Sequence, residues 1–158
     1  MESKVRLSKY SLGITIIVLG SLLAGILLVE DNKSWYFLFI VTFLLLLFSF
    51  RYSPVKIKAD EDNVTVKCIT RRHNIKIDEI ESVEMFQPTM TSFRLCGSGG
   101  FFGYWGIFKE GDIGRYAAYY GKVSDCFLIR MKNGNKYVLG CENPIEMVNF
   151  INSKIRPQ

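Results

Sequence analysis

Histidine is almost absent from this chain, and its few cysteines are widely separated. The sequence has one histidine, His73, and four cysteines, none in a CxxC pair. Zinc sites need closely spaced Cys and His ligands, so we expect no metal and no cofactor. The even cysteine count would fit two disulfides in an exported domain, but the topology deduced below favours a reducing compartment and free thiols. The four are Cys68, Cys96, Cys126 and Cys141.

Strong net charge is also lacking. The chain carries +5, and residues 54–158 carry only +3, from 15 Lys and Arg against 12 Asp and Glu. Nucleic-acid-binding domains usually show a strongly basic stripe, so no nucleic acid partner is expected. The remaining excess of positive charge lies at the flanks of two apolar stretches.

Those two stretches contain no charge at all. Residues 12–29 and 35–50 have no Asp, Glu, Lys or Arg, and only residues 30–34 link them. A helix rises about 1.5 Å per residue and the hydrocarbon core of a bilayer is about 30 Å thick, so each stretch with its flanking residues just spans a membrane. The sequence predicts a two-helix transmembrane hairpin over residues 1–53, with spans at about 11–29 and 35–52.

Aromatic residues stand at the ends of both stretches, as in the aromatic belts of membrane proteins. Tyr10 and Tyr52 mark one interface, and Trp35 and Tyr36 mark the other. A cleaved signal peptide is one alternative, but no A-x-A-like site follows the first stretch and a second begins at once. A buried hairpin of a soluble protein is another, but so short a chain could hardly cover two helices that are apolar all round.

Basic residues at the span ends predict the orientation. Six of them flank the outer ends, whereas the link holds Lys33 alone beside two acidic residues. Cytoplasmic flanks are enriched in Lys and Arg, so both termini are expected in the cytoplasm and the chain in the inner (cytoplasmic) membrane as a multi-pass protein. Three of these residues follow the second span and are expected beside anionic lipid: Arg51, Lys56 and Lys58.

Residues 54–158 form a second unit with the pattern of β-strands. Apolar and polar residues alternate in short segments at 55–59, 64–68, 75–77, 80–86, 126–131 and 136–141. Turn-forming residues separate them, including residues 60–63 and 71–74. Cys68 and Cys141 fall on the apolar side of their strands, where a thiol acts as a small hydrophobe.

The strongest helix signal of this unit follows the last strand. Asn143 can cap a helix, and Pro144 suits its first position. Four apolar residues then recur at helical spacing: Met147, Val148, Ile151 and Ile155. About seven strands closed by one C-terminal helix is the predicted architecture of residues 54–158.

Four segments carry a resemblance to a known family. They are residues 77–84, the glycine-aromatic stretch 94–106, residues 114–120, and the entry to the last helix at 141–144. In these the domain resembles the bacterial pleckstrin-homology-like (PH-like) domains of small membrane proteins, over nearly all of residues 54–158. The resemblance implies a curved antiparallel β-sandwich or partial barrel capped by a C-terminal α-helix. It implies no common reaction and, for most members, no known ligand.

PH domains are best known for gripping phosphoinositides with basic residues on the first two strands and their loop. Here that loop, residues 60–63, reads Asp-Glu-Asp-Asn, which repels phosphate. Lys56, Lys58 and Lys67 remain as a basic face, for which an ordinary solvated surface is the favoured interpretation.

The segment 97–108 is unusually rich in glycine and aromatic residues. It has neither the Gly-Lys-Ser/Thr of a phosphate loop nor the third glycine of a dinucleotide fingerprint. Three interpretations stay open: the aromatics fill the core while the glycines allow sharp bends, the aromatics lie in the bilayer interface, or they form a surface for a partner or for self-association. The candidate interaction residues are Phe101, Phe102, Tyr104, Trp105 and Phe108.

No catalytic constellation is evident. Ser98 lacks the GxSxG frame because Cys96 replaces the first glycine, and His73 is expected to be exposed in a basic turn. We therefore expect a non-catalytic interaction or regulatory module whose partners are the lipid bilayer and a protein or a second copy. The alternatives are a lipid- or peptide-sensing module using residues 97–108 and, more remotely, a cysteine-dependent enzyme with His73 as its base.

Overall fold

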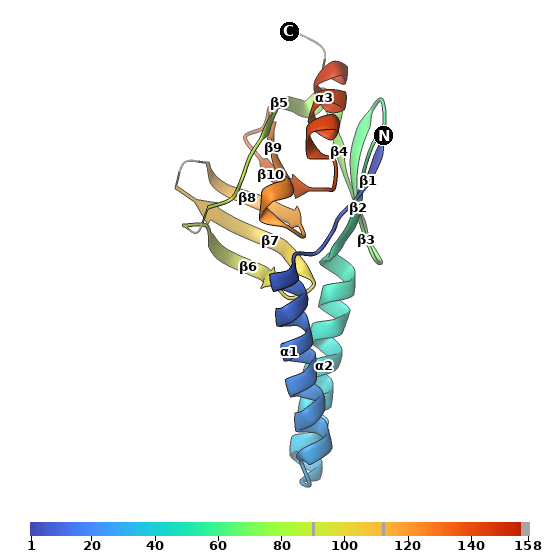
Figure 1. Ribbon diagram of the computed structural model, residues 1–158, viewed down its shortest axis with the longest axis vertical. Helices are drawn as coiled ribbons and strands as arrows, with labels where there is room; N and C mark the ends of the chain where they lie inside the picture. Colours follow the sequence, from blue (N-terminus) through green and yellow to red (C-terminus); the bar gives the residue numbers. More distant parts are fainter. Residues whose placement is uncertain (90, 112, 156–158) are drawn as a thin grey trace.

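The computed structural model describes residues 1–89, 91–111 and 113–155. Two long helices project from one end of a mainly-β domain (Figure 1). Helix α1 runs from Lys9 to Leu28 and helix α2 from Asn32 to Tyr52, close to the predicted spans. Ser8 and Asp31 cap their N-termini with side-chain oxygens.

Both helices are long and apolar enough to cross a membrane. Their 20 and 21 residues each rise about 30 Å, the thickness of a hydrocarbon core. Few of their side chains are buried by the rest of the structure, and most are exposed. The buried exceptions are hydroxyl residues near the domain: Ser11, Thr15 and Ser49.

The first sheet contains four antiparallel strands in the order β1-β2-β3-β4. They are β1 (Glu2–Lys4), β2 (Pro54–Ala59), β3 (Asn63–Cys68) and β4 (Arg72–Lys76). Strand β1 precedes α1 in the chain, yet it pairs with β2, which follows α2. The predicted division after residue 53 does not anticipate this three-residue strand. The helix pair is therefore joined to the same sheet at both of its outer ends.

The turn between β3 and β4 lies at residues 69–71, so the predicted turn at residues 71–74 is wrong. The Cys68 N–H donates to the Arg71 carbonyl at 2.8 Å and closes the turn. His73 pairs with Val66 inside the sheet. Polar residues at alternate positions made this strand resemble a loop, because they occupy its solvent face.

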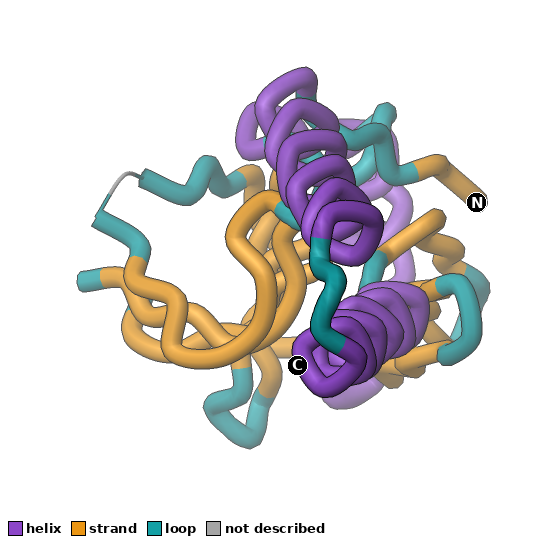
Figure 2. The backbone as a smooth tube through the Cα atoms, turned by 90° about the horizontal axis from the view of Figure 1, so that it is seen from below, coloured by secondary structure: helices purple, strands orange, loops and turns teal. Residues whose placement is uncertain are grey.

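The second sheet has six strands in the order β5-β9-β10-β8-β7-β6. They are β5 (Ile80–Met85), β6 (Phe93–Gly100), β7 (Gly103–Glu110), β8 (Gly114–Tyr120), β9 (Cys126–Met131) and β10 (Lys136–Gly140). Short 3-10 turns η1 (Ile77–Glu79) and η2 (Val123–Asp125) precede β5 and β9. Strands β8 and β10 are parallel and all other neighbours are antiparallel. Figure 2 shows how strongly the strands curve.

The described residues form ten strands, and nine of them lie after residue 53, where about seven were predicted. Strands β6, β7 and β8 come from the glycine-aromatic region and its continuation, where alternation is obscured. Strand β1 was not predicted, because it precedes the first apolar stretch and is separated by both helices from the rest of its sheet. The predicted fold class, an α-hairpin with a mainly-β PH-like domain, is confirmed.

The main core lies between the two sheets and is closed by helix α3 (Pro144–Lys154). Its fully buried members include Ile57, Val64, Val66, Ile129, Leu139, Met147 and Ile151. A second core lies on the opposite face of the six-stranded sheet and includes Phe108, Tyr116, Tyr120, Leu128 and Val138. Strands β9 and β10 are buried on both faces, so their apolar residues run consecutively rather than alternating.

Helix α3 buries Met147, Val148 and Ile151, and Ile155 packs against the same core, as the apolar stripe predicted. Asn143 stands at the N-cap and Pro144 at the first helical position, as predicted, but the Asn143 side chain makes no cap bond to the backbone. Cys68 and Cys141 are buried as expected.

Candidate functional site

The tip of the β6–β7 hairpin binds both helices where they meet the domain. The Phe102 N–H donates to Thr15 Oγ1 of α1 at 3.0 Å, and its carbonyl accepts from Ser53 Oγ, just after α2, at 2.8 Å. The Phe102 ring also meets Phe50 edge-on, with centroids 6.0 Å apart. One residue therefore fixes the hairpin to α1 and to the end of α2.

Glycine is required where the two hairpin strands cross most closely. Gly97 and Gly106 pair directly, with φ angles of +113° and +119°. A Cβ on Gly97 would lie 2.1 Å from the Trp105 carbonyl oxygen, and one on Gly106 would lie 2.2 Å from that of Cys96. No side chain fits there, and the left-handed backbone favours glycine independently. The glycines thus shape the hairpin that reaches the helices.

The five predicted interaction residues do not share one environment. Phe108 is only 4% exposed and packs in the second core, so it is unavailable as part of a surface in this structure. The other four are half-buried, at or near the junction with the helices. Trp105 stacks on Tyr52 at 5.6 Å, and Tyr104 stacks on Tyr120 at 4.8 Å. A binding role for Phe101, Phe102, Tyr104 and Trp105 stays a prediction.

Several residues of this junction were missed by the sequence analysis. Thr15 and Ser53 supply the two hydroxyl groups that hold Phe102. The Ser8 N–H donates to the Gly121 carbonyl at 2.9 Å, and the Thr70 N–H of the β3–β4 turn donates to the Phe50 carbonyl at 3.2 Å. Hydroxyl residues on one face at the domain ends of the apolar stretches were the available signal, because buried hydroxyls need partners.

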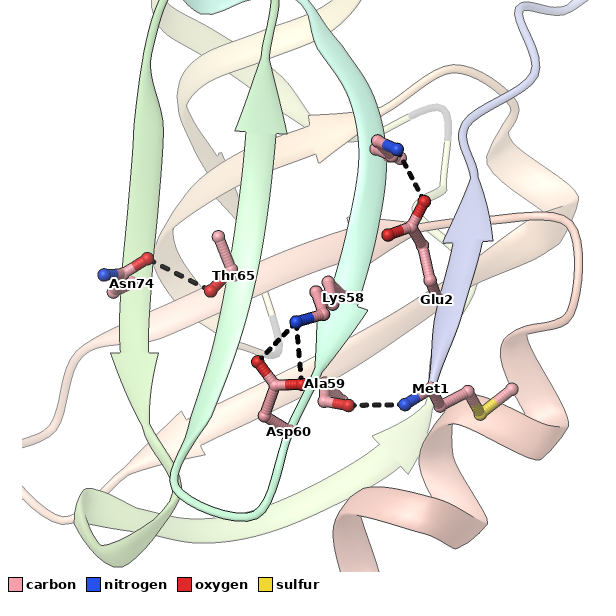
Figure 3. Close-up of polar contacts among 8 residues, drawn as sticks. Met1, Glu2, Lys58, Ala59, Asp60, Thr65 and Asn74 are labelled. Carbon is pink, nitrogen blue, oxygen red and sulfur yellow. Dashed lines mark hydrogen bonds and ion pairs between the residues drawn. The ribbon is translucent and has the colours of Figure 1, made fainter.

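A polar groove lies on the outer face of the four-stranded sheet (Figure 3). Its volume is about 390 Å³, and it is lined by Glu2, Lys56, Lys58, Asp60, Thr65, Lys67, Arg72 and Asn74. Thr65 Oγ1 donates to Asn74 Oδ1 at 3.1 Å. At the groove's edge, the Met1 ammonium donates to the Ala59 carbonyl at 2.6 Å, so the chain's first residue is fixed to the sheet.

The predicted lipid-contacting basic residues separate into two positions. Lys56 and Lys58 lie in the groove, where Lys56 Nζ is 2.5 Å from Glu2 Oε1 and Lys58 Nζ is 3.0 Å from Asp60. Arg51 lies in the last turn of α2, nearest the apolar helices. A role for all three at the membrane surface stays a prediction.

The cysteine and histidine side chains do not form a catalytic pair among the described residues. Burial raises the pKa of Cys68 to about 11 and also raises the pKa values of Cys126 and Cys141, so these thiols stay protonated. Cys96 is exposed on β6, whereas His73 lies on β4 in the other sheet.

The expectation of an exposed His73 is also wrong. His73 is half-buried between Tyr119 and Tyr137, with ring centroids 6.0 and 5.3 Å apart. Burial, aided by the charge of Arg71, lowers its pKa. No cluster of three metal-binding side chains occurs within residues 1–89, 91–111 and 113–155.

A family model described as a bacterial PH domain matches residues 55–155, which is most of the chain and runs from the second residue of β2 through α3. No curated protein and no solved structure matches the sequence. The match agrees with the two sheets and the closing C-terminal helix.

Proposed function

This chain belongs to the bacterial PH domain family, and from that premise we propose that it is a non-catalytic interaction module held at the cytoplasmic face of the inner membrane. Its two apolar helices serve as the anchor. The PH-like domain, including the N-terminal strand β1, serves as the part that contacts a partner.

The uncovered apolar surface of α1 and α2 supports the anchor. Exposing so much apolar side chain to water is unfavourable, whereas a bilayer solvates it. Both outer ends of the helix pair join the same sheet, so a membrane-spanning pair places the whole domain on one side. The excess of basic residues at that side supports a cytoplasmic position for the domain.

The observation that carries the proposal is the attachment of the domain to the helices. Strand β1, the Phe102 tip and the β3–β4 turn each bond to a helix end or to the chain beside it. A flexible tether would let the domain tumble, but these contacts hold its faces at a set height and angle. Such a geometry suits recognition of a partner that is itself bound to the membrane.

A second candidate is a lipid- or peptide-sensing module that uses residues 97–108. It is favoured by one observation: half-buried Phe101, Phe102 and Trp105 lie beside the ends of the apolar helices, where a bilayer interface would be. The Phe102 backbone already binds both helices, so Phe101→Ala in the full chain is the clean test. Weaker binding of peptide or altered lipid preference in nanodiscs would favour sensing.

Photocrosslinking in native membranes tests the main proposal. A photoreactive amino acid is placed singly at Thr65 in the groove, Phe93 on β6, Glu146 on α3 or Lys132 in the β9–β10 turn. We expect a discrete protein adduct from at least one position, identified by mass spectrometry. A reporter fused after Gln158 should be active in the cytoplasm. Absence of any discrete adduct, or a periplasmic reporter, would contradict the proposal.

A further inference from the structure

A row of four basic residues crosses the outer face of the first sheet. The strand register places Lys4 opposite Lys56, Lys56 opposite Lys67, and Lys67 opposite Arg72. One residue comes from each strand, and each points away from the buried side, which holds Ser3, Ile57 and Val66. We call these four residues the basic row. No local run of the sequence contains it, because its first two members are separated by both helices.

The basic row is electrostatically unfavourable by itself. Directly opposed side chains in antiparallel strands have Cβ atoms about 4.5–5.5 Å apart, and like charges in such positions destabilise the sheet. Lys56 is neutralised by Glu2. Lys4, Lys67 and Arg72 make no ion pair with any described residue. The fold therefore holds about three uncompensated positive charges in one line, which is the arrangement expected of a surface that receives an anionic partner.

Three members of the basic row line the polar groove, and the shape of this groove indicates what kind of partner can bind. It continues past the neighbouring row of Glu2, Lys58, Thr65 and Asn74 to Asp60, at the far end of β2 (Figure 3). Strand β2 starts just after α2 and its six residues rise about 20 Å. Lipid headgroups extend only roughly 5–8 Å beyond the hydrocarbon core. Because β2 runs away from the helix pair (Figure 1), headgroups around the helices lie closer to the basic row than to the Asp60 end of the groove.

The chemistry of the groove also changes from the basic row to the Asp60 end. The basic row carries net positive charge. Toward Asp60 the groove is neutral, because Lys58 pairs with Asp60 and the Asn74 amide and Thr65 hydroxyl lie beside them. An elongated molecule with carboxylates at one end and neutral hydrogen-bonding groups at the other fits this division. An extended polypeptide presents side chains on one face every second residue, about 6.8 Å apart, and can span both parts.

We propose that the outer face of the β1–β4 sheet binds an extended, acidic segment of a membrane-bound partner protein, with the partner's carboxylates on the basic row. This rests on the proposed function and names the chemistry of the partner. The opposed positive charges weaken the free sheet, and the partner's carboxylates relieve that repulsion when they bind.

The test uses the full-length protein in nanodiscs of zwitterionic lipid. The probe is a fluorescent peptide of alternating Glu and Ser, and binding is followed by fluorescence anisotropy at several salt concentrations. The row variant combines Lys67→Glu with Arg72→Glu. The matched control combines Lys109→Glu with Lys132→Glu, which makes the same change in net charge at exposed lysines outside the groove.

We expect the peptide to bind the unmodified protein and the control alike, with affinity that falls as salt rises. The row variant should bind at least about tenfold more weakly, because two attractive contacts become repulsive. A peptide of alternating Lys and Ser should bind the row variant instead. Thermal unfolding of the row variant guards against misfolding. The variant should be no less stable, because position 67 then faces Lys56 with the opposite charge, while positions 67 and 72 still carry like charges as they did before.

Equal losses in the row variant and the control would overturn the proposal, because general charge would explain the binding. It is also overturned if the unmodified protein ignores the peptide while inorganic phosphate or nanodiscs of anionic lipid engage the basic row. Failure here is distinct from failure of the proposed function. A discrete crosslink at Phe93 or Glu146 with no peptide binding would retain the module and refute this docking face.

Discussion

The close approach of Gly97 and Gly106 makes Gly106→Ala the most informative single substitution in the domain. The new Cβ would lie 2.2 Å from the Cys96 carbonyl oxygen, and the backbone has φ +119°. The left-handed backbone costs about 1–2 kcal/mol for a residue with a Cβ. Displacing the facing backbone costs about 1–3 kcal/mol more, by analogy with overpacked cores. We expect about 3 kcal/mol of lost stability in total, or a melting temperature lower by roughly 12–24 °C for a domain of this size.

Substitutions at two other glycines separate the cost of the left-handed backbone from the cost of the steric clash. Gly114 has φ +74° but no heavy atom within 4 Å of the place that a Cβ would take, so Gly114→Ala tests the backbone cost alone. We expect it to lose about 1 kcal/mol, or roughly 4–8 °C. Gly111 has open space and no left-handed φ, so Gly111→Ala should be neutral or slightly stabilising, by up to about 1 kcal/mol.

Thermal unfolding in detergent micelles, followed by tryptophan fluorescence, measures all three variants. The chain has two tryptophans, and Trp105 is adjacent to the substituted residue. The order of melting temperatures should be Gly111→Ala highest, then Gly114→Ala, then Gly106→Ala. If Gly106→Ala melts no lower than Gly114→Ala, the steric argument for the hairpin crossing is wrong.

Two further substitutions test the junction and the histidine. Thr15→Val removes the acceptor of the Phe102 N–H, so it should cost about 1–3 kcal/mol of stability and speed hydrogen exchange at that amide. Thr42→Val is the control, because the Thr42 hydroxyl donates to Leu38 of its own helix, and it should leave exchange at Phe102 unchanged. His73 has a lowered pKa in the folded state, so below about pH 6.5 the unfolded chain binds a proton that the folded chain resists, and the melting temperature should fall as pH drops from about 7.5 to about 5.5. His73→Gln should flatten this dependence of the melting temperature on pH, since the chain has no other histidine. An unchanged slope would mean that another group causes the dependence.

Local periodicity made much of the fold predictable. Uncharged runs of membrane-spanning length identified α1 and α2, because the length of an apolar helix can be compared directly with bilayer thickness. Alternation identified β2, β3, β5, β9 and β10, and apolar spacing identified α3. Strand β4 was located only in part, since polar residues on its exposed side resembled a turn.

The candidate sites depended on contacts that no local pattern encodes. The glycines of residues 97–108 were correctly singled out, but the helices that the hairpin binds lie about 50 to 90 residues earlier in the chain. Phe108 and Trp105 are both aromatic residues of the same glycine-rich segment, and the sequence does not distinguish their environments. Only strand register places Phe108 in the second core and Trp105 against Tyr52.

By itself the sequence determined the apolar helix pair, the mainly-β character of the domain and its closing helix, because each follows from the spacing of apolar residues along a short stretch. Tertiary structure alone decided that β1 joins the sheet beyond the helices, that Phe102 binds Thr15 and Ser53, and that four basic residues align across four strands. These depend on which backbone groups of distant segments pair, and pairing register is set by the packing of the whole core.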